Sequence, residues 1–269
     1  MLWNDILKER SSAGFSLRQT FQEQFQKAVL TYLSKENTFQ QLVLQGGTAL
    51  RLFYHNPRFS EDLDFVTVEN KNTFNVSPVL HNSISFLLSQ FPFLQEVTCK
   101  KQKEDELLQR YILTTHSSNP DQHIRLHIEY VHVPSHENEP RILSFPPLQP
   151  VVRVETQQEI LTDKVLALCY RPYLKGRDLW DIYYLTKEQQ IPIQWDLLWK
   201  KTKDYHCSIQ ETQKALQQIP TLLQDQGKQA LEKEMQRFLP PTSFSSYTHL
   251  FPTMINHIIS VTKNMEHHP

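Results

Sequence analysis

Apolar and polar positions along this chain of 269 residues change period several times, and the sharpest changes fall in one short stretch. The apolar run at residues 42–44 predicts a buried strand that ends at Gly46-Gly47. From Thr48 the apolar residues recur at helical spacing, and Asn56-Pro57 predicts the end of that helix. A second strand is expected to begin near Ser60. The pattern therefore predicts a strand, a helix and a strand in close succession.

Hydrophobic periodicity elsewhere in the first half of the chain predicts helices on a sheet. Apolar residues recur at helical spacing over residues 15–34 and 77–91. The sequences VTCKKQ, RYILTTH and HIRLHIEYVHV have the composition and alternation of strands, and the charged residues 101–106 predict a hairpin turn between the first two. We therefore expect an α/β (α+β) fold in which helices flank a mixed sheet.

Proline content marks the expected domain boundary. Residues 134–150 contain five prolines and no periodic pattern, which indicates a linker or an extended crossing segment. The chain after this segment has helical spacing, with a helix end expected at Pro220. We therefore expect a core domain over residues 1–133 and a helical domain over residues 151–269.

Two aspartates on the second predicted strand are the most informative charged residues of the chain. Strand side chains alternate between faces, so Asp62 and Asp64 share one face while Leu63 and Phe65 share the other. Like charges this close repel each other, and a bound divalent cation removes that cost. Mg²⁺ prefers oxygen ligands of this kind, together with water and substrate phosphates. The pair therefore predicts a magnesium site.

The double glycine predicts an anion site beside the aspartates. Without a Cβ, Gly46 and Gly47 allow the backbone to approach a ligand closely. A helix beginning at Thr48 would direct free N–H groups and its positive dipole end at a phosphate. Taken singly, an Asp-x-Asp pair is often a solvated strand face, and a Gly-Gly pair is often a plain turn. Their combination around one helix is much rarer and favours a joint phosphate and metal site.

A third carboxylate lies on the last strand predicted before the proline-rich segment. Ile128 and Tyr130 belong to the apolar side of that strand, so Glu129 faces away from it, as His127 does. From the residues alone, Glu129 is either an addition to the carboxylate site or an exposed strand residue. His127 is more typical of a surface or cleft-lining residue than of a metal ligand.

The helical region holds another group of charged residues. Lys164 lies at the polar margin of an apolar helical stripe, and Asp178 and Asp181 lie one turn apart on the next predicted helix. A lysine in such a place usually extends its ammonium to solvent, and Asp178 is also a candidate helix N-cap. A triphosphate site needs cations against its charge, however, which favours a functional role for Lys164.

Two stretches of the sequence resemble a known family. GGTALRLFYHNPRFSEDLDF is similar to the Gly-Gly-Ser/Thr and Asp-x-Asp signature of the AbiEii/AbiGii-type nucleotidyltransferase toxins, which belong to the polymerase-β-like superfamily. DKVLALCYRPYLKGRDLWDIYYL is similar to that family's later motifs, a Lys on one helix and Arg-Asp-x-x-Asp on the next. The resemblance implies a nucleotidyltransferase fold and transfer of a nucleoside monophosphate (NMP) from a nucleoside triphosphate (NTP) to an RNA such as the tRNA acceptor end. It also implies the toxin of a toxin–antitoxin or phage-defence pair, with a separately encoded antitoxin.

The resemblance assigns expected roles to the candidate residues. Two divalent ions, Mg²⁺ or Mn²⁺, would be held by Asp62, Asp64 and Glu129, and Glu129 would accept the proton of the acceptor hydroxyl. The nucleotide phosphates would be held by Gly46, Gly47, Thr48, Ser60, Lys164 and Arg51. Asp178 would organise the catalytic or phosphate-binding region, supported by Arg177 and Asp181. Weaker contacts with phosphate or acceptor would come from Arg171 and Lys175.

Net charge narrows the classes of partner. The formal net charge is −1 and the pI is about 6.9, so no global basic field indicates a nucleic-acid coat protein or a membrane-surface binder. Any contact with nucleic acid must be local. Lys200, Lys201 and Lys203, next to aromatic residues, form either a small patch of this kind or, more simply, a solvated helix end.

Cysteine usage and the absence of targeting signals bear on the compartment. Cys99, Cys169 and Cys207 are an odd number without C-x-x-C spacing, which argues against a disulfide framework or a zinc site and for a reducing environment. The sequence has no signal-peptide pattern and no run long enough to cross a bilayer, so we expect a cytoplasmic protein without a membrane partner. Two other functions stay open: nucleotidyl transfer to a protein or small-molecule hydroxyl, and a non-catalytic nucleotide- or RNA-binding module.

Overall fold

The structure is a computed structural model that describes residues 1–69 and 74–263. The chain forms two compact units. The first consists of Met1–His55 and Phe59–Glu155, and the second consists of Asn56–Arg58 and Thr156–Pro269. The short segment Asn56–Arg58 therefore belongs to the unit that the second half of the chain builds.

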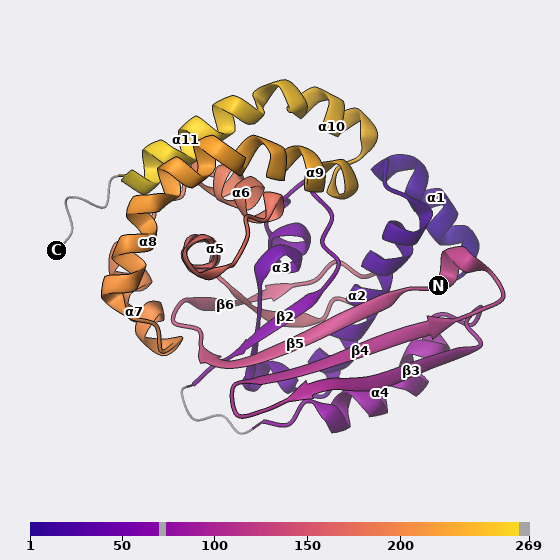
Figure 1. The fold of residues 1–269 in the computed structure, drawn as a ribbon. Helices are drawn as coiled ribbons and strands as arrows, with labels where there is room; N and C mark the ends of the chain where they lie inside the picture. The colour runs from indigo at the N-terminus through magenta and orange to yellow at the C-terminus, as the bar shows by residue number, and fades with distance from the viewer. Residues whose placement is uncertain (70–73, 264–269) are drawn as a thin grey trace. The chain divides into compact units, whose positions relative to one another are not determined.

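A mixed sheet is the centre of the first unit (Figure 1). In the described part of the chain it has seven strands in the order β3-β4-β5-β2-β1-β7-β6. Their bounds are β1 Leu42–Gln45, β2 Leu63–Thr67, β3 Glu96–Glu104, β4 Leu108–His116, β5 Arg125–Pro134, β6 Asn138–Ile142 and β7 Val151–Glu155. β2 lies in the middle, where it pairs antiparallel with β1 and parallel with β5. β1 in turn pairs parallel with β7.

The helices of the first unit pack on the sheet and on one another. Their bounds are α1 Trp3–Ala13, α2 Leu17–Lys35, α3 Gly46–Phe53 and α4 Ser77–Gln90. α4 packs on β3 and α2 packs on α4, and both lie behind the sheet in the view of Figure 1. Between them the rings of Phe21, Phe25, Phe91 and Phe93 meet mainly edge to face. This aromatic cluster joins α2 to the segment that directly follows α4.

The second unit is helical. Its α-helices are α5 Gln157–Tyr170, α6 Gly176–Tyr183, α7 Trp195–Asp204, α8 Ile209–Leu222, α9 Lys228–Phe238, α10 Pro241–Tyr247 and α11 Phe251–Lys263. α6 packs closely on α9, and Gly176 permits this approach because it has no side chain. A Cβ at Gly176 would lie 2.2 Å from the backbone oxygen of Ala230. Thr156 caps α5 by accepting a hydrogen bond from the amide of Glu159.

The predicted fold class is confirmed: a mixed sheet with helices is followed by a helical C-terminal region. The expected helix end at Pro220 is wrong, because α8 runs to Leu222 and the proline lies in its last turn. The proline-rich segment 134–150 contains β6, and β7 directly follows it. The compact units divide at Glu155, and the division into functional domains at 134–150 stays a prediction. Among the described residues, no helix has both the length and the apolarity to cross a membrane.

Candidate active site

The turn between β1 and α3 is shaped by a glycine that touches an aspartate. Gly46 has φ +73°, a conformation that residues with a side chain rarely adopt. A Cβ at this position would lie 3.1 Å from Oδ2 of Asp64. Helix α3 begins at Gly46, two residues before the predicted start at Thr48. The Thr48 hydroxyl donates a hydrogen bond to the backbone carbonyl of Asp62, which ties the start of the helix to the approach of β2.

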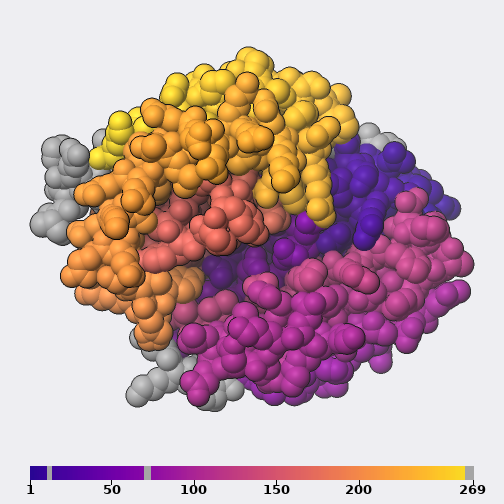
Figure 2. Space-filling model, viewed as in Figure 1, coloured from indigo at the N-terminus to yellow at the C-terminus, as the bar shows by residue number. Residues whose placement is uncertain are grey.

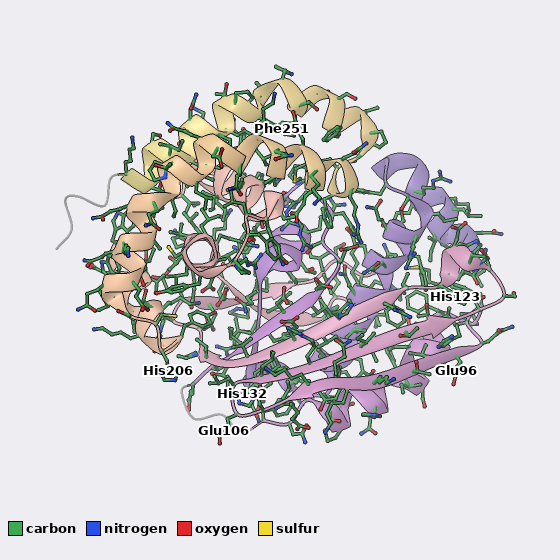
Figure 3. All side chains as sticks on the ribbon, viewed as in Figure 1. Glu96, Glu106, His123, His132, His206 and Phe251 are labelled. Atoms are coloured by element: carbon green, nitrogen blue, oxygen red, sulfur yellow. The ribbon has the colours of Figure 1, made fainter. Side chains whose placement is uncertain are left out.

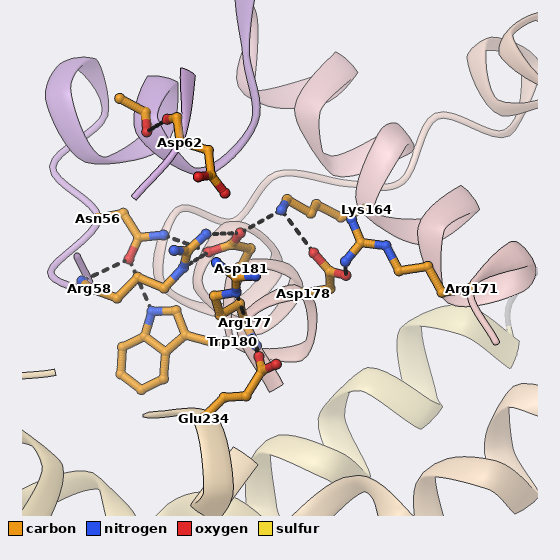
Figure 4. A network of polar contacts seen from close by, with 11 residues as sticks. Asn56, Arg58, Asp62, Lys164, Arg171, Arg177, Asp178, Trp180, Asp181 and Glu234 are labelled. Atoms are coloured by element: carbon orange, nitrogen blue, oxygen red, sulfur yellow. Dashed lines mark hydrogen bonds and ion pairs between the residues drawn. The ribbon is translucent and has the colours of Figure 1, made fainter. Parts of the chain in front are cut away.

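The two aspartates flank the first residue of β2. Leu63 and Phe65 are fully buried, while Asp62 and Asp64 are partly exposed. The alternation therefore places both carboxylates on the face opposite the core, as predicted. Asp62 directly precedes the strand, whose first residue is Leu63. Figure 4 shows the Asp62 carboxylate extending away from the backbone of this segment.

Glu129 lies on the same face as Asp64. The two residues are direct partners in the parallel register of β2 and β5, and partners in register point to the same side of a sheet. Glu129 also forms an ion pair with Arg110 of β4, with 2.8 Å between Nε and Oε1. Within residues 1–69 and 74–263, no group of three or more His, Cys, Asp or Glu side chains is placed to hold a metal ion. The register thus brings Glu129 beside Asp64 without forming a three-carboxylate cage.

The donor set still suits a magnesium ion. Mg²⁺ is usually held by one or two carboxylates together with water and substrate phosphates, and dedicated cages made only of protein ligands are uncommon. Asp62 and Asp64 supply two carboxylates on one face, and the missing Cβ of Gly46 lets the backbone of the turn approach Asp64 closely. These two residues fit the ion better than the full set of three does.

Two other residues predicted to hold phosphates have contacts of their own. Ser60 is nearly buried, and its carbonyl accepts a hydrogen bond from the side-chain amide of Gln26 on α2. Arg51 donates from Nε to Glu23 at 2.7 Å, and its guanidinium lies 4.8 Å from the ring centre of Phe15. The structure therefore directs Arg51 toward α2, whereas Gly46, Thr48, Asp62 and Asp64 are brought together.

A buried ion network lies in the second unit (Figure 4). Asp181 is fully buried and accepts two hydrogen bonds from Arg58, at 2.6 Å from Nε and 2.5 Å from Nη2. The amide of Asn56 donates a third at 2.9 Å, and Asn56 itself accepts one from the indole of Trp180. Burial alone would raise the pKa of Asp181, but Arg58 and Lys164 outweigh it and lower the pKa to about 2. Asp181 is therefore a charged residue with a full set of partners.

Lys164 joins this carboxylate to a second one. Its Nζ lies 2.9 Å from Oδ1 of Asp178 and 3.0 Å from Oδ2 of Asp181. Arg171 approaches the other oxygen of Asp178 at 2.5 Å. Burial alone would raise the pKa of Asp178, but Lys164 and Arg171 outweigh it and lower the pKa. Burial alone would lower the pKa of Lys164, but Asp178 and Asp181 outweigh it and raise the pKa. Lys164, Asp178 and Asp181 therefore form one ionised cluster, as the i, i+3 spacing of the aspartates allows.

The remaining basic residues of this region point elsewhere. The backbone amide of Arg177 donates to Glu234 at 2.9 Å, and its guanidinium lies 4.6 Å from the ring centre of Phe238. Lys175 has a lowered pKa, first because of burial and then because Arg171 and Arg177 are near. Arg177 is thus held to α9.

Sequence reasoning missed three residues that the structure makes central to the second unit. Asn56 was predicted only to end a helix and Arg58 was given no role, although two aspartates on a short helix signal a need for cations. Lys201 is completely buried and donates to Glu159 and Asp163 at 2.7 Å each. It therefore cannot belong to the exposed basic patch considered for residues 200–203.

Comparisons with known proteins identify the fold and the family. A family model described as the nucleotidyl transferase AbiEii toxin of type IV toxin–antitoxin systems matches residues 28–250. No curated protein sequence matches the chain. The structure of JHP933 from Helicobacter pylori has a TM-score of 0.57 at 19% identity and covers 94% of this chain and 97% of that chain. A candidate nucleotidyltransferase from H. pylori has a TM-score of 0.55 at 20% identity, covering 92% of this chain and 97% of that one.

The two kinds of comparison carry different weight. At such low identity the solved structures support the fold alone. The family model covers most of the chain, including the glycine turn, the Asp62 and Asp64 pair and the Lys164 region. The resemblance noted in the sequence is therefore confirmed, and the chain belongs to the AbiEii family of nucleotidyltransferase toxins of type IV toxin–antitoxin systems.

Proposed function

We propose that this nucleotidyltransferase uses Mg²⁺ or Mn²⁺ to transfer an NMP from an NTP to the hydroxyl of an RNA acceptor, such as the end of a tRNA. The observation that carries the proposal is the contact between the glycine turn and the carboxylate pair. Gly46 lacks the Cβ that would crowd Asp64, so the start of α3 lies directly against this carboxylate, and a phosphate bound at the helix start would be a neighbour of a metal ion on Asp64.

The start of α3 and the three nearby carboxylates would each have a separate role in the reaction. The amides at the start of α3, those of Gly47 and Thr48 among them, would donate to phosphate oxygens. Asp62 and Asp64 would hold the metal ion, which when bound neutralises charge between the carboxylates and the triphosphate. Glu129, one strand away on the same face, would accept the proton of the attacking hydroxyl.

The second unit contributes to the proposal through the family's later motifs. Lys164 would contact phosphate, with Asp178 and Asp181 fixing the position of its ammonium. As the toxin of a toxin–antitoxin or phage-defence pair, the protein would be neutralised by a separately encoded antitoxin.

The test is transfer of label from each of the α-³²P-labelled NTPs into total RNA and total protein, with Mg²⁺ or Mn²⁺. We compare the wild type with Asp62→Asn/Asp64→Asn, and Asp121→Asn serves as control because it changes an exposed aspartate of the same unit. Label in RNA that disappears only in the double variant supports the proposal. Label in protein would reassign the acceptor, and nucleotide binding without metal dependence or turnover would make the protein a binding module.

A further inference from the structure

One face of strands β3, β4 and β5 is open. Along β4, Tyr111 and Leu113 are buried, whereas Arg110, Ile112 and Thr114 are partly exposed. β5 alternates in the same way, and the open side is the one that carries Glu129 and Asp64. In the space-filling view the magenta and pink atoms of these strands form a broad exposed surface (Figure 2).

Cross-strand register arranges the side chains of this open face in rows. The first row consists of Lys103, Arg110, Glu129 and Asp64 on β3, β4, β5 and β2. The second consists of Lys100, Ile112 and His127, and the third of Thr98, Thr114 and Arg125. Because neighbouring strands lie about 4.8 Å apart, Lys103 is roughly 14 Å from Asp64 along the first row. The rows lead from the carboxylates outward across the sheet.

The outer part of the face is cationic. It carries Lys100, Lys103, Arg110 and Arg125, and of these Arg110 pairs with Glu129 and Lys103 with Asp105 at 2.7 Å. Lys100 and Arg125 are exposed and form no ion pair with any described residue. Figure 3 shows Glu96 and Glu106 at opposite ends of the β3–β4 hairpin, so acidic residues bound the cationic rows at both ends.

The composition of the face fits a polyanion better than a protein partner. Protein interfaces have an apolar, well-packed core, whereas large aliphatic side chains are few here: Ile112 lies in the three rows, and Leu108 pairs with Val131 in the next row toward the β3–β4 turn. Repeated cations on a flat surface suit the repeated phosphates of a nucleic acid, and the His127 ring offers a stacking surface for a base.

We propose that this open face binds the phosphate backbone of a single-stranded stretch of the RNA acceptor and leads its reactive end to Asp62 and Asp64. The inference rests on the proposed function for the identity of the acceptor, but its geometry comes from the first unit alone. Lys100 and Arg125 contact phosphates directly, and Arg110 keeps the polynucleotide apart from the charge of Glu129.

The test measures binding of a fluorescein-labelled, mixed-sequence RNA of about 12 nucleotides, a length within the usual single-strand site size. Anisotropy is recorded between about 50 and 200 mM salt, without NTP or metal. The variant Lys100→Glu/Arg125→Glu is compared with Lys35→Glu/Lys214→Glu, which makes the same charge change at exposed helical lysines. A milder pair, Lys100→Gln/Arg125→Gln, separates lost contacts from added repulsion.

We expect the glutamate pair on the sheet to weaken binding roughly tenfold or more and to reduce the salt slope by about 1.4, since each lost phosphate contact removes about 0.7. The glutamine pair should show the same slope change with a smaller loss of affinity, and the helical control should stay within about twofold of the wild type. Melting temperatures should not change, because all four positions are exposed.

Three results would overturn the inference: equal losses in the sheet variant and the helical control, wild-type binding in the sheet variant, or equal competition by a poly-glutamate peptide of matched charge. Because binding is measured without chemistry, the two proposals can fail separately. Salt-dependent binding through Lys100 and Arg125 without any nucleotidyl transfer would sink only the proposed function. Nucleotidyl transfer to RNA at the wild-type rate in the Lys100 and Arg125 variants would contradict only the proposed RNA-binding face.

Discussion

Two aspartate pairs with similar sequence patterns have opposite surroundings in this protein. Asp62 and Asp64 are partly exposed beside a glycine turn, whereas Asp178 and Asp181 are buried among Arg58, Lys164 and Arg171. The spacing of each pair matches its secondary structure, i to i+2 on a strand and i to i+3 on a helix, so each pair shares one face. Spacing therefore indicates which two carboxylates share a face, and burial distinguishes the pair that we propose to bind a metal ion from the pair whose charges are balanced within the protein.

The largest expected effect tests the exposed pair. Asp64→Asn keeps the shape of the side chain but removes the charge that a metal ion needs, so transfer activity should fall at least about 10³-fold, or roughly 4 kcal/mol of transition-state stabilisation. The melting temperature should stay the same, because the residue is partly exposed. Steady-state label transfer and a thermal melt of the same sample measure both. A large loss of stability would remove the contrast with the buried pair.

The next effect tests the buried pair. Arg58→Ala leaves the buried carboxylate of Asp181 without its bidentate partner, and breaking one side of a buried ion pair costs about 3–5 kcal/mol. Urea unfolding should show this loss as a lower midpoint with an unchanged slope. Arg18→Ala, an exposed arginine on α2, is the control and should change stability by less than about 0.5 kcal/mol. Equal stability of the two variants would show that the network contributes little.

The pH dependence of the free energy of unfolding tests the buried aspartate pair in a second way. The pKa of Asp181 is about 2 in the folded protein against an ordinary value of 3.8, so its contribution is complete above about pH 4 and is lost as the pH falls toward 2. The difference corresponds to about 2 kcal/mol. Urea unfolding between these pH values should therefore show a steeper loss of stability in the wild type than in Asp181→Asn. Parallel curves for the two proteins would contradict the assignment.

The smallest effect concerns the glycine turn. Gly46→Ala forces a Cβ into a left-handed backbone conformation and against Asp64, which should cost about 1 kcal/mol of stability. Gly14→Ala is a matched control, because Gly14 has nearly the same φ of +71° at the end of α1. Both variants should lose similar stability, but only Gly46→Ala should lose transfer activity, by about tenfold or more. Equal transfer activity in the two variants would show that the close contact between Gly46 and Asp64 is not needed for the reaction.

The local part of the site could be predicted from the sequence. The strand before Gly46, the short helix after it and the shared face of Asp62 and Asp64 follow from periodicity and turn chemistry within about 25 residues. The orientation of Glu129 follows from the alternation of β5. The parallel pairing that makes Glu129 the direct neighbour of Asp64 is a long-range contact, which periodicity alone does not define.

The buried networks could not be predicted in the same way. Arg58 and Asp181 are 123 residues apart, and Lys201 lies 42 residues from Glu159. Charged residues are almost never fully buried unless they are paired, and single-sequence patterns do not reveal a distant partner. Lys201 was therefore placed among exposed lysines, and Arg58 was given no role, although both are among the largest fully buried side chains.

Because residues 56–58 belong to the second unit, their native partners are synthesised much later than they are. A ribosome completes Arg58 long before Asp181, and at about 5–20 residues per second the interval of 123 residues lasts roughly 6–25 seconds. During that time the guanidinium has no native carboxylate to join. A fragment that ends at Glu155 would keep Arg58 without Asp181. Replacing the helical region by one without a carboxylate at the position of Asp181 would leave Arg58 unmatched in the same way.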